Sequence, residues 1–535
     1  MAYALEKLKR KLALPASLVI ELPPPEVETD LAIPSFQQSP EAIAKKIRGL
    51  REPLIEKAVV TGRYVNLTLD KRLLARAVLS EINKLGNKYG HQPPRRKKII
   101  LEYSSPNIAK PLHIGHLRNT VIGQALGNIY RASGYQVTTE NWLGDWGKQY
   151  GLVILAYQKW GRGKEFKKKP TQHLFKLYVK AIAQAKKDPK IDDQAREIFR
   201  KIENGDKKLL RIWQRFRRAS ISDFKKTYKI INAKFDIWSG ESFYVPFIPQ
   251  TIQEALQKKA AIKDPTGPVV VDLNKYGLRS YLLVKGDGAS LYSARDLATA
   301  IYRLKKYQPE KLIYVIGNEQ EFYFRQLFKT LELMGYQKSK LARVVYGIVT
   351  QKGSKMSTRV GNVTTMEEIL KEAVKKASDP KIGIGAVRYN LLSQSNEKNV
   401  SFDWQRILNL QGNSAPYIQY GYIRTQSILK KAGQRPQQKI RMSDIDKLSP
   451  SEEKLVKLLA LFPEMVNKSC QLNQPHFVAT YLNNLVQEFS RFYNEVPVIK
   501  SEGATRNFRL TLVAAVGRVI KNGLALLEIE MPRKM

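Results

Sequence analysis

The fold of this chain is decided by one stretch, Ser104-Ser-Pro-Asn-Ile-Ala-Lys-Pro-Leu-His-Ile-Gly-His116. It follows an apolar run, Ile99-Ile-Leu-Glu-Tyr103, whose length and composition predict a buried strand. Residues 117–130 come next and carry apolar side chains at helical spacing. The stretch is therefore predicted to be a strand-to-helix loop, with the helix beginning near His113. The unpaired N–H groups and partial positive charge of a helix N-terminus favour a bound phosphate.

Two histidines, His113 and His116, lie on this predicted first turn with Gly115 between them. Imidazoles can donate hydrogen bonds to a ligand, and a glycine lets the ligand approach the backbone. The alternative is a helix cap with two surface histidines. The chain has only five histidines, however, and two of them fall at the carboxyl end of a strand, where α/β folds bind ligands. The pattern therefore favours a phosphate site.

The composition sets the class of protein. The 535 residues are 43% hydrophobic, which is enough for large cores and suggests about three domains. We find no run of about 18 apolar residues, so we expect no membrane contact. In residues 1–22, Pro15 and Glu21 interrupt the apolar part, which argues against a cleaved signal and leaves an organellar transit peptide open. A single cysteine, Cys470, excludes internal disulfides and Cys-x-x-Cys metal sites and favours the cytoplasm.

The charge balance is strongly basic. The chain has 91 Lys and Arg against 48 Asp and Glu, a formal net charge of +43. A polyanionic partner is expected, and nucleic acid fits best. A general drift to lysine that affects only solubility is the alternative. Because the excess is spread along the chain, it predicts a long contact surface more than a basic arm.

The order of predicted elements indicates a multidomain α/β protein. Residues 1–95, with an alternating strand at Tyr64–Leu69, predict a small α+β domain. Residues 96–402 alternate strands with helices, which predicts a Rossmann-like domain with a parallel sheet. A lysine-rich helical insertion interrupts this domain at about residues 152–270. Residues 403–535 carry amphipathic helices and predict an all-α bundle.

The sheet of the middle domain is predicted from further apolar runs. The strand at residues 135–141 follows the first helix. After the insertion we expect the α/β pattern to resume at residues 281–284 and to continue with strands at 311–317 and 344–349. The loops that follow these strands should therefore meet at one edge of the sheet.

A second loop with candidate chemistry is Lys352-Gly-Ser-Lys-Met-Ser-Thr-Arg-Val-Gly-Asn362. A glycine-containing, basic and mobile loop can close over a triphosphate and neutralise developing charge. Alone this signal is weak.

Tyr292 and Asp296 form a possible site for a cationic side chain. They stand four apart at the start of a predicted helix and so share one face. A carboxylate beside a phenol offers a salt bridge and an aromatic wall. The alternative is that Asp296 pairs within the chain, with Arg303 or Arg295.

The sequence His113-Ile-Gly-His116 is identical to the HIGH motif of class I aminoacyl-tRNA synthetases. The residues ahead of it resemble arginyl-tRNA synthetases, which place Ser-x-Asn-x-x-Lys there, as Ser105, Asn107 and Lys110 do in this chain. The second loop is similar to the class I KMSKS motif, with Thr358 in place of the second lysine and Arg359 in place of the final serine. Arginyl-tRNA synthetases often lack that lysine, and the lysine before their HIGH motif is thought to substitute.

The resemblance implies the following site residues. Catalysis is expected from His113, His116, Lys110 and Lys355. ATP is expected to contact these four together with Pro106, Gly115, Met356 and Ser357. Arginine is expected to contact Ser105, Asn107, Asn141, Glu241, Tyr292, Asp296 and Gln320. The family usually has a histidine where this chain has Tyr323, which leaves the role of that position open.

The resemblance also implies the activity. Such an enzyme activates L-arginine with ATP, with Mg²⁺ expected, and transfers the arginyl group to the 3′ end of tRNA(Arg), and arginine activation is expected to need bound tRNA. The N-terminal domain is expected to contact the tRNA elbow, and the C-terminal bundle the anticodon. We expect a monomer with no metal site formed by the protein.

Two alternatives are weighed against this reading. Another class I synthetase of similar architecture, such as a cysteinyl enzyme, needs zinc ligands that a chain with one cysteine lacks. A non-catalytic tRNA-binding paralogue predicts loss of His113, His116 or Lys355, and all three are present. Other nucleotide-binding folds are disfavoured because the chain has no Gly-x-x-x-x-Gly-Lys-Ser/Thr sequence.

Overall fold

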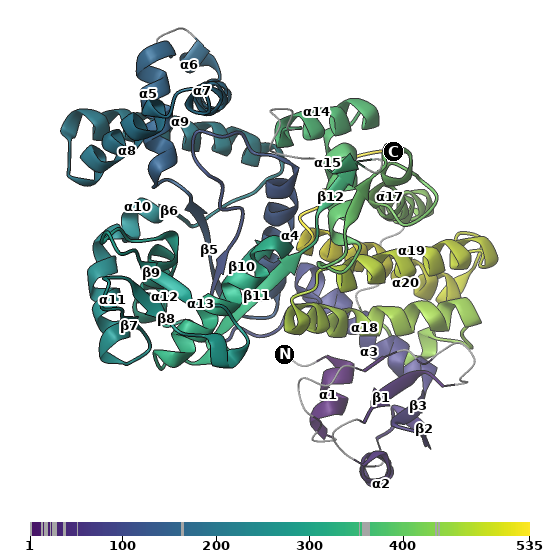
Figure 1. The fold of residues 1–535 in the computed structure, drawn as a ribbon. Helices are drawn as coiled ribbons and strands as arrows, with labels where there is room; N and C mark the ends of the chain where they lie inside the picture. Colours follow the sequence, from purple (N-terminus) through teal and green to yellow (C-terminus); the bar gives the residue numbers. More distant parts are fainter. Residues whose placement is uncertain are drawn as a thin grey trace.

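The fold is described from a computed structural model of the chain (Figure 1). The structure describes residues 3–535 except 12–13, 15–19, 22, 24–28, 36–38, 51, 162–164, 352–353, 356–363, 434–435 and 437–438, and it leaves out the side chains of 351, 354 and 355.

A five-stranded parallel sheet forms the centre of the molecule. Its strands are, in chain order, β4 (Lys98–Glu102), β5 (Gln136–Leu143), β6 (Ile237–Gly240), β10 (Lys311–Gly317) and β11 (Leu341–Tyr346). Their spatial order is β11-β10-β4-β5-β6, so the chain builds one half outward from β4 and then returns to build the other half from β10. The order reverses between β4 and β10, which is the point where α/β sheets bind ligands. The predicted parallel sheet is confirmed.

Helices cover both faces of this sheet (Figure 1). Leu101 of β4 shares one core with α4 (Ile114–Ala132), the helix that follows the HIGH-like sequence. Ile100 points to the opposite face and shares a second core with α12 (Tyr292–Tyr307). This alternation explains why residues 99–101 are all apolar, since a strand buried on both faces favours apolar side chains at successive positions.

The helical insertion forms a separate lobe at the carboxyl edge of the sheet (Figure 1). It consists of α5 (Lys148–Trp160), α6 (Glu165–Lys168), α7 (Pro170–Ala185), α8 (Lys190–Glu203) and α9 (Lys207–Ile230). The expected range of about 152–270 differs from this arrangement, because β6 already returns the chain to the sheet beside β5. A strand of four residues is too short to give a periodic signal in the sequence.

The segment between β6 and β10 forms a small layer of its own. It contains α10 (Glu241–Tyr244), α11 (Ile248–Gln257) and the antiparallel strands β7 (Ile262–Lys263), β8 (Val269–Val271) and β9 (Tyr281–Val284). The sequence suggested that residues 281–284 resume the α/β pattern, but β9 pairs with β8 rather than with the central sheet. The strand nevertheless leads directly into α12.

A second small sheet follows β11 and carries the start of the KMSKS-like loop. It contains β12 (Val349–Gln351), β13 (Ser354–Lys355) and β14 (Val400–Phe402) in the order β13-β12-β14. β12 pairs antiparallel with β13 and parallel with β14. Between β13 and β14 lie α14 (Met366–Ala377) and α15 (Pro380–Leu392), and α16 (Trp404–Ile407) comes after β14.

The two ends of the chain form the remaining domains. The N-terminal part has α1 (Ala4–Lys11), α2 (Pro40–Gly49), α3 (Lys71–Leu85) and an antiparallel sheet of β1 (Leu31–Pro34), β3 (Tyr64–Leu69) and β2 (Ile55–Thr61). The C-terminal part is a bundle of α17 (Ala415–Ala432), α18 (Pro450–Leu472), α19 (His476–Glu495) and α20 (Gly503–Leu526). The predicted all-α bundle is confirmed.

The N-terminal domain packs against this bundle, next to α18 (Figure 1). The hydroxyl of Tyr89 donates to the carbonyl of Leu459 at 2.9 Å, and buried Lys9 pairs with Glu464. Among the residues that the structure describes, no helix is long and apolar enough to cross a membrane.

Candidate active site

The loop between β4 and α4 is held in an uncommon backbone conformation. Ser104, Ser105 and Ala109 have φ angles of 72°, 45° and 61°, in the left-handed region that non-glycine residues rarely adopt. Such strain persists where surrounding contacts fix it, and it is concentrated at functional sites. Here the Ser104 N–H donates to the Asn119 side chain at 2.5 Å, and the Ala109 N–H donates to the Ser220 hydroxyl at 3.0 Å. Helices α4 and α9 therefore both hold the loop.

The two histidines cap the start of α4. Nδ1 of His113 accepts the Gly115 N–H at 3.1 Å, and Nδ1 of His116 accepts the His113 N–H at 3.2 Å. Because both Nδ1 atoms are acceptors, each neutral ring carries its proton on Nε2. Burial lowers the pKa of His113 to about 4 and also lowers the pKa of His116. At neutral pH the pair therefore offers two uncharged Nε2–H donors. The cap at His113 also confirms the predicted start of the helix.

Two glycines allow the backbone to pack closely here. A Cβ at residue 115 would lie 2.9 Å from Cε1 of His113, so a side chain there would displace the ring. A Cβ at Gly144, in the loop after β5, would lie 1.9 Å from Oδ1 of Asn107. The Gly144 N–H also donates to the carbonyl of buried Pro106 at 3.1 Å. The loops after β4 and β5 thus form one rigid surface.

Lys110 extends from the strained loop toward the insertion. Its Nζ lies 4.9 Å from the ring centroid of Tyr178 on α7. Burial lowers the pKa of Lys110, and no ion pair joins Lys110 to a carboxylate in the part of the chain that the structure describes. A partly desolvated ammonium with only an aromatic neighbour can accept a phosphate without first breaking a salt bridge.

The segment that follows the second loop contacts these residues. The backbone of Lys355 lies in β13, while its side chain, and Met356, Ser357, Thr358 and Arg359 as a whole, lie outside the described residues. On the far side of the loop, the Met366 N–H donates to the Leu112 carbonyl at 2.9 Å, and Thr365 forms a backbone bridge with His113. The fold therefore places Thr365, three residues after the KMSKS-like loop, next to the first histidine.

Asp296 lies on α12 beneath two tyrosines. Its carboxylate accepts a short hydrogen bond from the Tyr323 hydroxyl, which in turn accepts from the Tyr281 hydroxyl at 3.0 Å. The rings of Tyr323 and Tyr292 lie 5.2 Å apart, and Tyr292 is 55% exposed, so it forms the open side of the site. Burial raises the pKa of Asp296 to about 7. The structure thus gives Tyr323 a role: it hydrogen-bonds the predicted guanidinium-binding carboxylate.

The alternative partners of Asp296 are occupied by other carboxylates. Nε of Arg295 pairs with Glu241 at 2.8 Å, and burial raises the pKa of Glu241 to about 8. Fully buried Arg303 pairs with Glu140 at 2.9 Å and with Glu102. The alternative reading, in which Asp296 pairs with Arg295 or Arg303, is therefore not what the structure shows. Four carboxyl groups face two guanidinium groups in this cluster, so a bound cationic ligand would favour the ionised form of the carboxyl groups whose pKa burial raises.

Asn141 lies at the carboxyl end of β5 with no exposed surface. Its Nδ2 donates to the Tyr228 hydroxyl at 3.2 Å, and Tyr228 also bonds the Ser104 hydroxyl at 2.6 Å. Its Oδ1 is buried and has no hydrogen-bond partner among the described residues. An unpaired buried acceptor is costly, so a donor that reached this atom would relieve that cost.

The other predicted arginine contacts are less closely grouped. The Ser105 hydroxyl donates to Glu102 at 3.2 Å, which ties it to the buried carboxylates. Asn107 is exposed on the same loop. Gln320 follows β10 and is also exposed, and its side chain accepts the Gly317 N–H at 3.4 Å. All three lie at the carboxyl ends of β4 and β10, on either side of the point where the strand order reverses.

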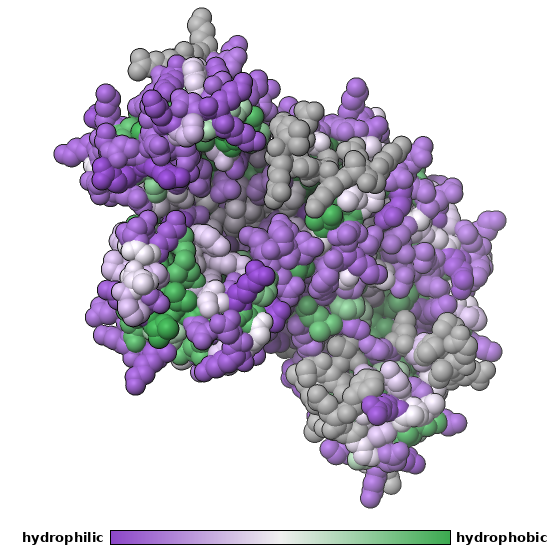
Figure 2. Space-filling model, viewed as in Figure 1, coloured by the Kyte–Doolittle hydropathy of each residue, from purple (hydrophilic) through white to green (hydrophobic). Residues whose placement is uncertain are grey.

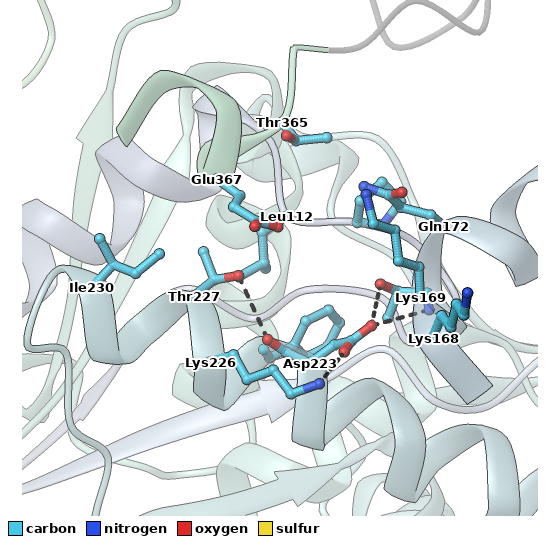
Figure 3. A pocket seen from close by; sticks show the side chains of 13 residues that line it. Leu112, Lys168, Lys169, Gln172, Asp223, Lys226, Thr227, Ile230, Thr365 and Glu367 are labelled. Carbon is cyan, nitrogen blue, oxygen red and sulfur yellow. Dashed lines mark hydrogen bonds and ion pairs between the residues drawn. The ribbon is translucent and has the colours of Figure 1, made fainter. Parts of the chain in front are cut away.

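A separate pocket of about 190 Å³ lies between the β4–α4 loop, at Pro111 and Leu112, and the helical insertion (Figure 3). It is lined by Leu112, by residues of α6, α7 and α9, and by Glu367 of α14. Figure 3 shows Lys226 and Asp223 on the α9 side, joined at 3.2 Å, and Lys168 and Lys169 on the α6–α7 side. None of the predicted ATP or arginine contacts lines this pocket, so it adjoins the candidate site without being part of it.

Two groups of site residues were missed by sequence reasoning. Glu102 and Glu140 are carboxylates within otherwise buried strands, and that mismatch with an apolar pattern was a usable signal. Arg118, two residues after the second histidine, is 0% exposed, and within the described part of the chain it bonds to backbone carbonyls alone. An arginine inside an apolar helix was the corresponding signal for it.

Comparison with protein families matches two models. Residues 78–382 match the catalytic domain of class I tRNA synthetases of the arginine (R) type. Residues 418–535 match the DALR anticodon binding domain.

Individual relatives cover nearly the whole chain. An arginine--tRNA ligase of Streptococcus pneumoniae is 38% identical over 544 aligned residues, covering 97% of this chain and 96% of the relative. One of Halothermothrix orenii is 36% identical and covers 97% and 95%. The solved arginyl-tRNA synthetase of Thermus thermophilus has a TM-score of 0.84 at 24% identity, covering 99% of this chain and 98% of its own, and this likeness bears on the fold.

Proposed function

The chain belongs to the class I arginyl-tRNA synthetases, and on that premise we propose how its residues carry out the arginine--tRNA ligase reaction. The observation that carries the assignment of arginine is the Asp296 carboxylate, which has Tyr323 and Tyr292 around it while the neighbouring arginines pair elsewhere. A substrate guanidinium would supply the charge that this cluster lacks.

ATP is proposed to bind at the start of α4, with contacts from the KMSKS-like sequence. The Nε2–H groups of His113 and His116 would donate to phosphate oxygens, and the backbone at Gly115 lets the phosphates approach the helix start. Lys110 would neutralise phosphate charge from the insertion side and Lys355 from the second loop, with Pro106, Met356 and Ser357 as further contacts.

Arginine is proposed to lie across the strand ends of β4, β5 and β10. Its guanidinium would pair with Asp296 against Tyr292, and the unpaired Oδ1 of Asn141 would accept from its ammonium. Ser105, Asn107, Glu241 and Gln320 are proposed to complete the contacts. Because Glu241 is held by Arg295, it would act mainly by setting the charge around the pocket.

The chemistry needs no protein nucleophile. The arginine carboxylate attacks the α-phosphorus of ATP, and pyrophosphate leaves with the electron pair of the broken P–O bond. A terminal ribose hydroxyl of the tRNA then attacks the carbonyl carbon and AMP leaves, giving the arginyl ester. Positioning and charge stabilisation supply the rate, as in other phosphoryl-group chemistry.

Mg²⁺ fits this site only as part of the nucleotide. Among the described residues, no group of three or more His, Cys, Asp and Glu side chains could hold a metal ion. Such an ion would accompany the triphosphate and keep phosphate oxygens and water as ligands.

The tRNA is proposed to bind through basic residues on the surface of the molecule. Figure 2 shows hydrophilic residues dominating the visible face of the insertion, and the chain carries a net charge of +43. We propose that residues 1–95 and 403–535 contact the tRNA outside the catalytic domain of residues 96–402. A monomer in the cytoplasm remains a proposal, which light scattering and cell fractionation can test.

Affinity for tRNA should fall steeply with salt. Lys and Arg that neutralise phosphates release bound counterions, so the logarithm of the association constant falls linearly with the logarithm of salt concentration. With several contacts we expect a loss of about 10³-fold or more between roughly 50 and 200 mM salt. Filter binding at a series of salt concentrations checks this. A flat response would mean that the positive charge serves solubility rather than tRNA binding.

Arginine binding should weaken below about pH 7. Burial raises the pKa of Asp296 to about 7, and a protonated carboxyl cannot pair with a guanidinium. The KM for arginine should therefore rise about tenfold for each pH unit below that value and level off above it. Because the Tyr323 hydroxyl bond lowers the pKa of Asp296, Tyr323→Phe should move the inflection to higher pH. Steady-state kinetics from about pH 5 to 8 measure both effects.

The assigned reaction is tested by charging total tRNA with each amino acid in turn, in the presence of ATP. Charging with arginine alone supports the proposal. Charging with a different amino acid would assign another class I activity, and tRNA binding without any charging would identify a non-catalytic paralogue. Omitting tRNA from an ATP–pyrophosphate exchange assay tests whether arginine activation needs it.

A further inference from the structure

Arg118 joins two distant segments to the helix that carries the histidines. It lies one turn into α4 and is 0% exposed. Its Nη1 donates to the carbonyls of Gly347 at 2.5 Å and Ile348 at 3.4 Å. Its Nη2 donates to the carbonyls of Asn396 at 2.9 Å and Lys398 at 2.7 Å. One guanidinium therefore holds four carbonyls, and the described residues give it no carboxylate partner.

This arrangement requires the geometry of an arginine. Burial lowers the pKa of Arg118 to about 10, so the group still carries its charge at neutral pH. Its planar fork reaches both segments at once, whereas a lysine ammonium is a single point that could reach only part of the set. A buried charge satisfied only by carbonyls is costly, and such a cost is usually kept where position matters.

The four carbonyls mark where two parallel strands begin. Gly347 and Ile348 come immediately before β12, and Asn396 and Lys398 come before β14, which pairs with β12 from Val349 onward. A Cβ at Gly347 would lie 2.6 Å from the Glu397 carbonyl, so the two segments already touch. Arg118 therefore fixes the starting positions of both strands relative to α4.

The position of β13, the strand that carries Lys355, depends on the position of β12. β13 pairs antiparallel with β12, with Thr350 opposite Lys355. The first turn of α4, one turn before Arg118, carries His113 and His116. The Arg118 side chain thus connects the HIGH-like motif with the strand pair that carries Lys355, and both are proposed to contact the phosphates.

The C-terminal bundle holds the same segment from its other side. The Asn396 N–H donates to the side chain of Gln474 at 3.0 Å, and the Asn396 side chain donates to the Asn473 carbonyl at 2.8 Å. These two residues form the turn between α18 and α19. Residues 396–398 are therefore fixed between Arg118 and the bundle.

We propose that Arg118 is a positioning residue for ATP: it fixes the β12–β13 hairpin that carries Lys355 against the helix start that carries the two histidines. The inference rests on the proposed function for the identity of the nucleotide. The clamp, by which we mean Arg118 and the four carbonyls that it holds, rests only on the contacts above. A change of about 1 Å in the position of a phosphate contact can cost about 100-fold in rate.

The test compares Arg118→Met with a matched control, Arg388→Met. Arg388 on α15 is 1% exposed and donates to the carbonyls of Leu527 at 3.2 Å and Ile231 at 2.8 Å, away from both motifs. Arg118→Met should lower kcat/KM for ATP by about 10–100-fold, with the KM for arginine within about twofold of the wild type. Arg388→Met should lose thermal stability and keep the wild-type KM for ATP.

A readout without activity separates this inference from the proposed function. Hydrogen exchange at the amides of β12 and β14 should rise in Arg118→Met and not in Arg388→Met. If the wild type fails to charge tRNA, the proposed function falls while this measurement still tests the clamp. Equal kinetic losses in the two variants, or unchanged exchange in Arg118→Met, would overturn the inference.

Two milder variants cover the case in which Arg118→Met does not fold. Arg118→Lys keeps a charge and should retain part of the kcat/KM for ATP. Asn399→Ala removes the exposed side chain whose Oδ1 accepts the Ile348 N–H at 3.0 Å, loosening the same strand start without burying a new group. It should raise the KM for ATP while the KM for arginine stays constant, and a rise in both would contradict the proposal.

Discussion

Lys110→Met should lower the rate of arginyl-adenylate formation by about 10²–10³-fold. One preorganised contact to charge that develops in the transition state contributes about 3–4 kcal/mol, which corresponds to this range. Lys110 is suited to that role because its Nζ rests on the ring of Tyr178 and burial lowers its pKa. The second loop carries Thr358 where most class I enzymes have a lysine. Single-turnover adenylate formation, with tRNA present, measures the rate.

Lys180→Met is the matched control for this experiment. Lys180 lies on the same helix as Tyr178 and rests on Trp160 at 4.6 Å, a contact of the same kind at an exposed position. It should leave the rate close to that of the wild type. If Lys110→Met also keeps a near-normal rate, the lysine ahead of the HIGH-like motif does not replace the missing one.

Asp296→Asn should raise the KM for arginine strongly. Removing one partner of an enclosed charge pair costs about 2–5 kcal/mol, so kcat/KM for arginine should fall by at least about 30-fold. The amide oxygen can still accept from Tyr323, so the fold around the site should persist. Kinetics with arginine and with ATP as the varied substrate measure the effect, and the KM for ATP should change little.

Tyr323→Phe provides the comparison for Asp296→Asn. It removes a hydrogen bond to the carboxylate and keeps the charge, so its effect on arginine at pH 8 should be much smaller. An unchanged KM for arginine in Asp296→Asn would mean that the carboxylate supports the structure and that the guanidinium binds elsewhere.

The sequence predicted those parts of the site that depend on local order along the chain. The helix start at His113 follows from a strand, a loop and an apolar periodicity that lie within about 30 residues, and the structure has the cap at that residue. The sharing of one face by Tyr292 and Asp296 likewise follows from helical spacing. These features needed no information about distant contacts.

Other features depend on which segments meet in space. The spacing left open whether Asp296 pairs with Arg303, because nothing local shows that Glu102 and Glu140, more than 160 residues earlier, already occupy that arginine. The assignment of β9 to a small antiparallel sheet depends on its pairing with β8, which periodicity does not report. The clamp at Arg118 likewise appears only when residues 347 and 396 are adjacent.

The packing of the N-terminal domain on α18 has a consequence for synthesis on the ribosome. Tyr89 bonds to Leu459, and Lys9 to Glu464, so these partners are separated by 370 and 455 residues. At about 5–20 residues per second, the first domain waits roughly 20–90 s before its docking surface has been translated. Throughout that interval the Lys9 ammonium, which ends 4% exposed, has no Glu464 to pair with. The nascent first domain therefore exposes, until late in translation, a surface that the finished protein buries in one hydrophobic core with Leu459 and Phe462.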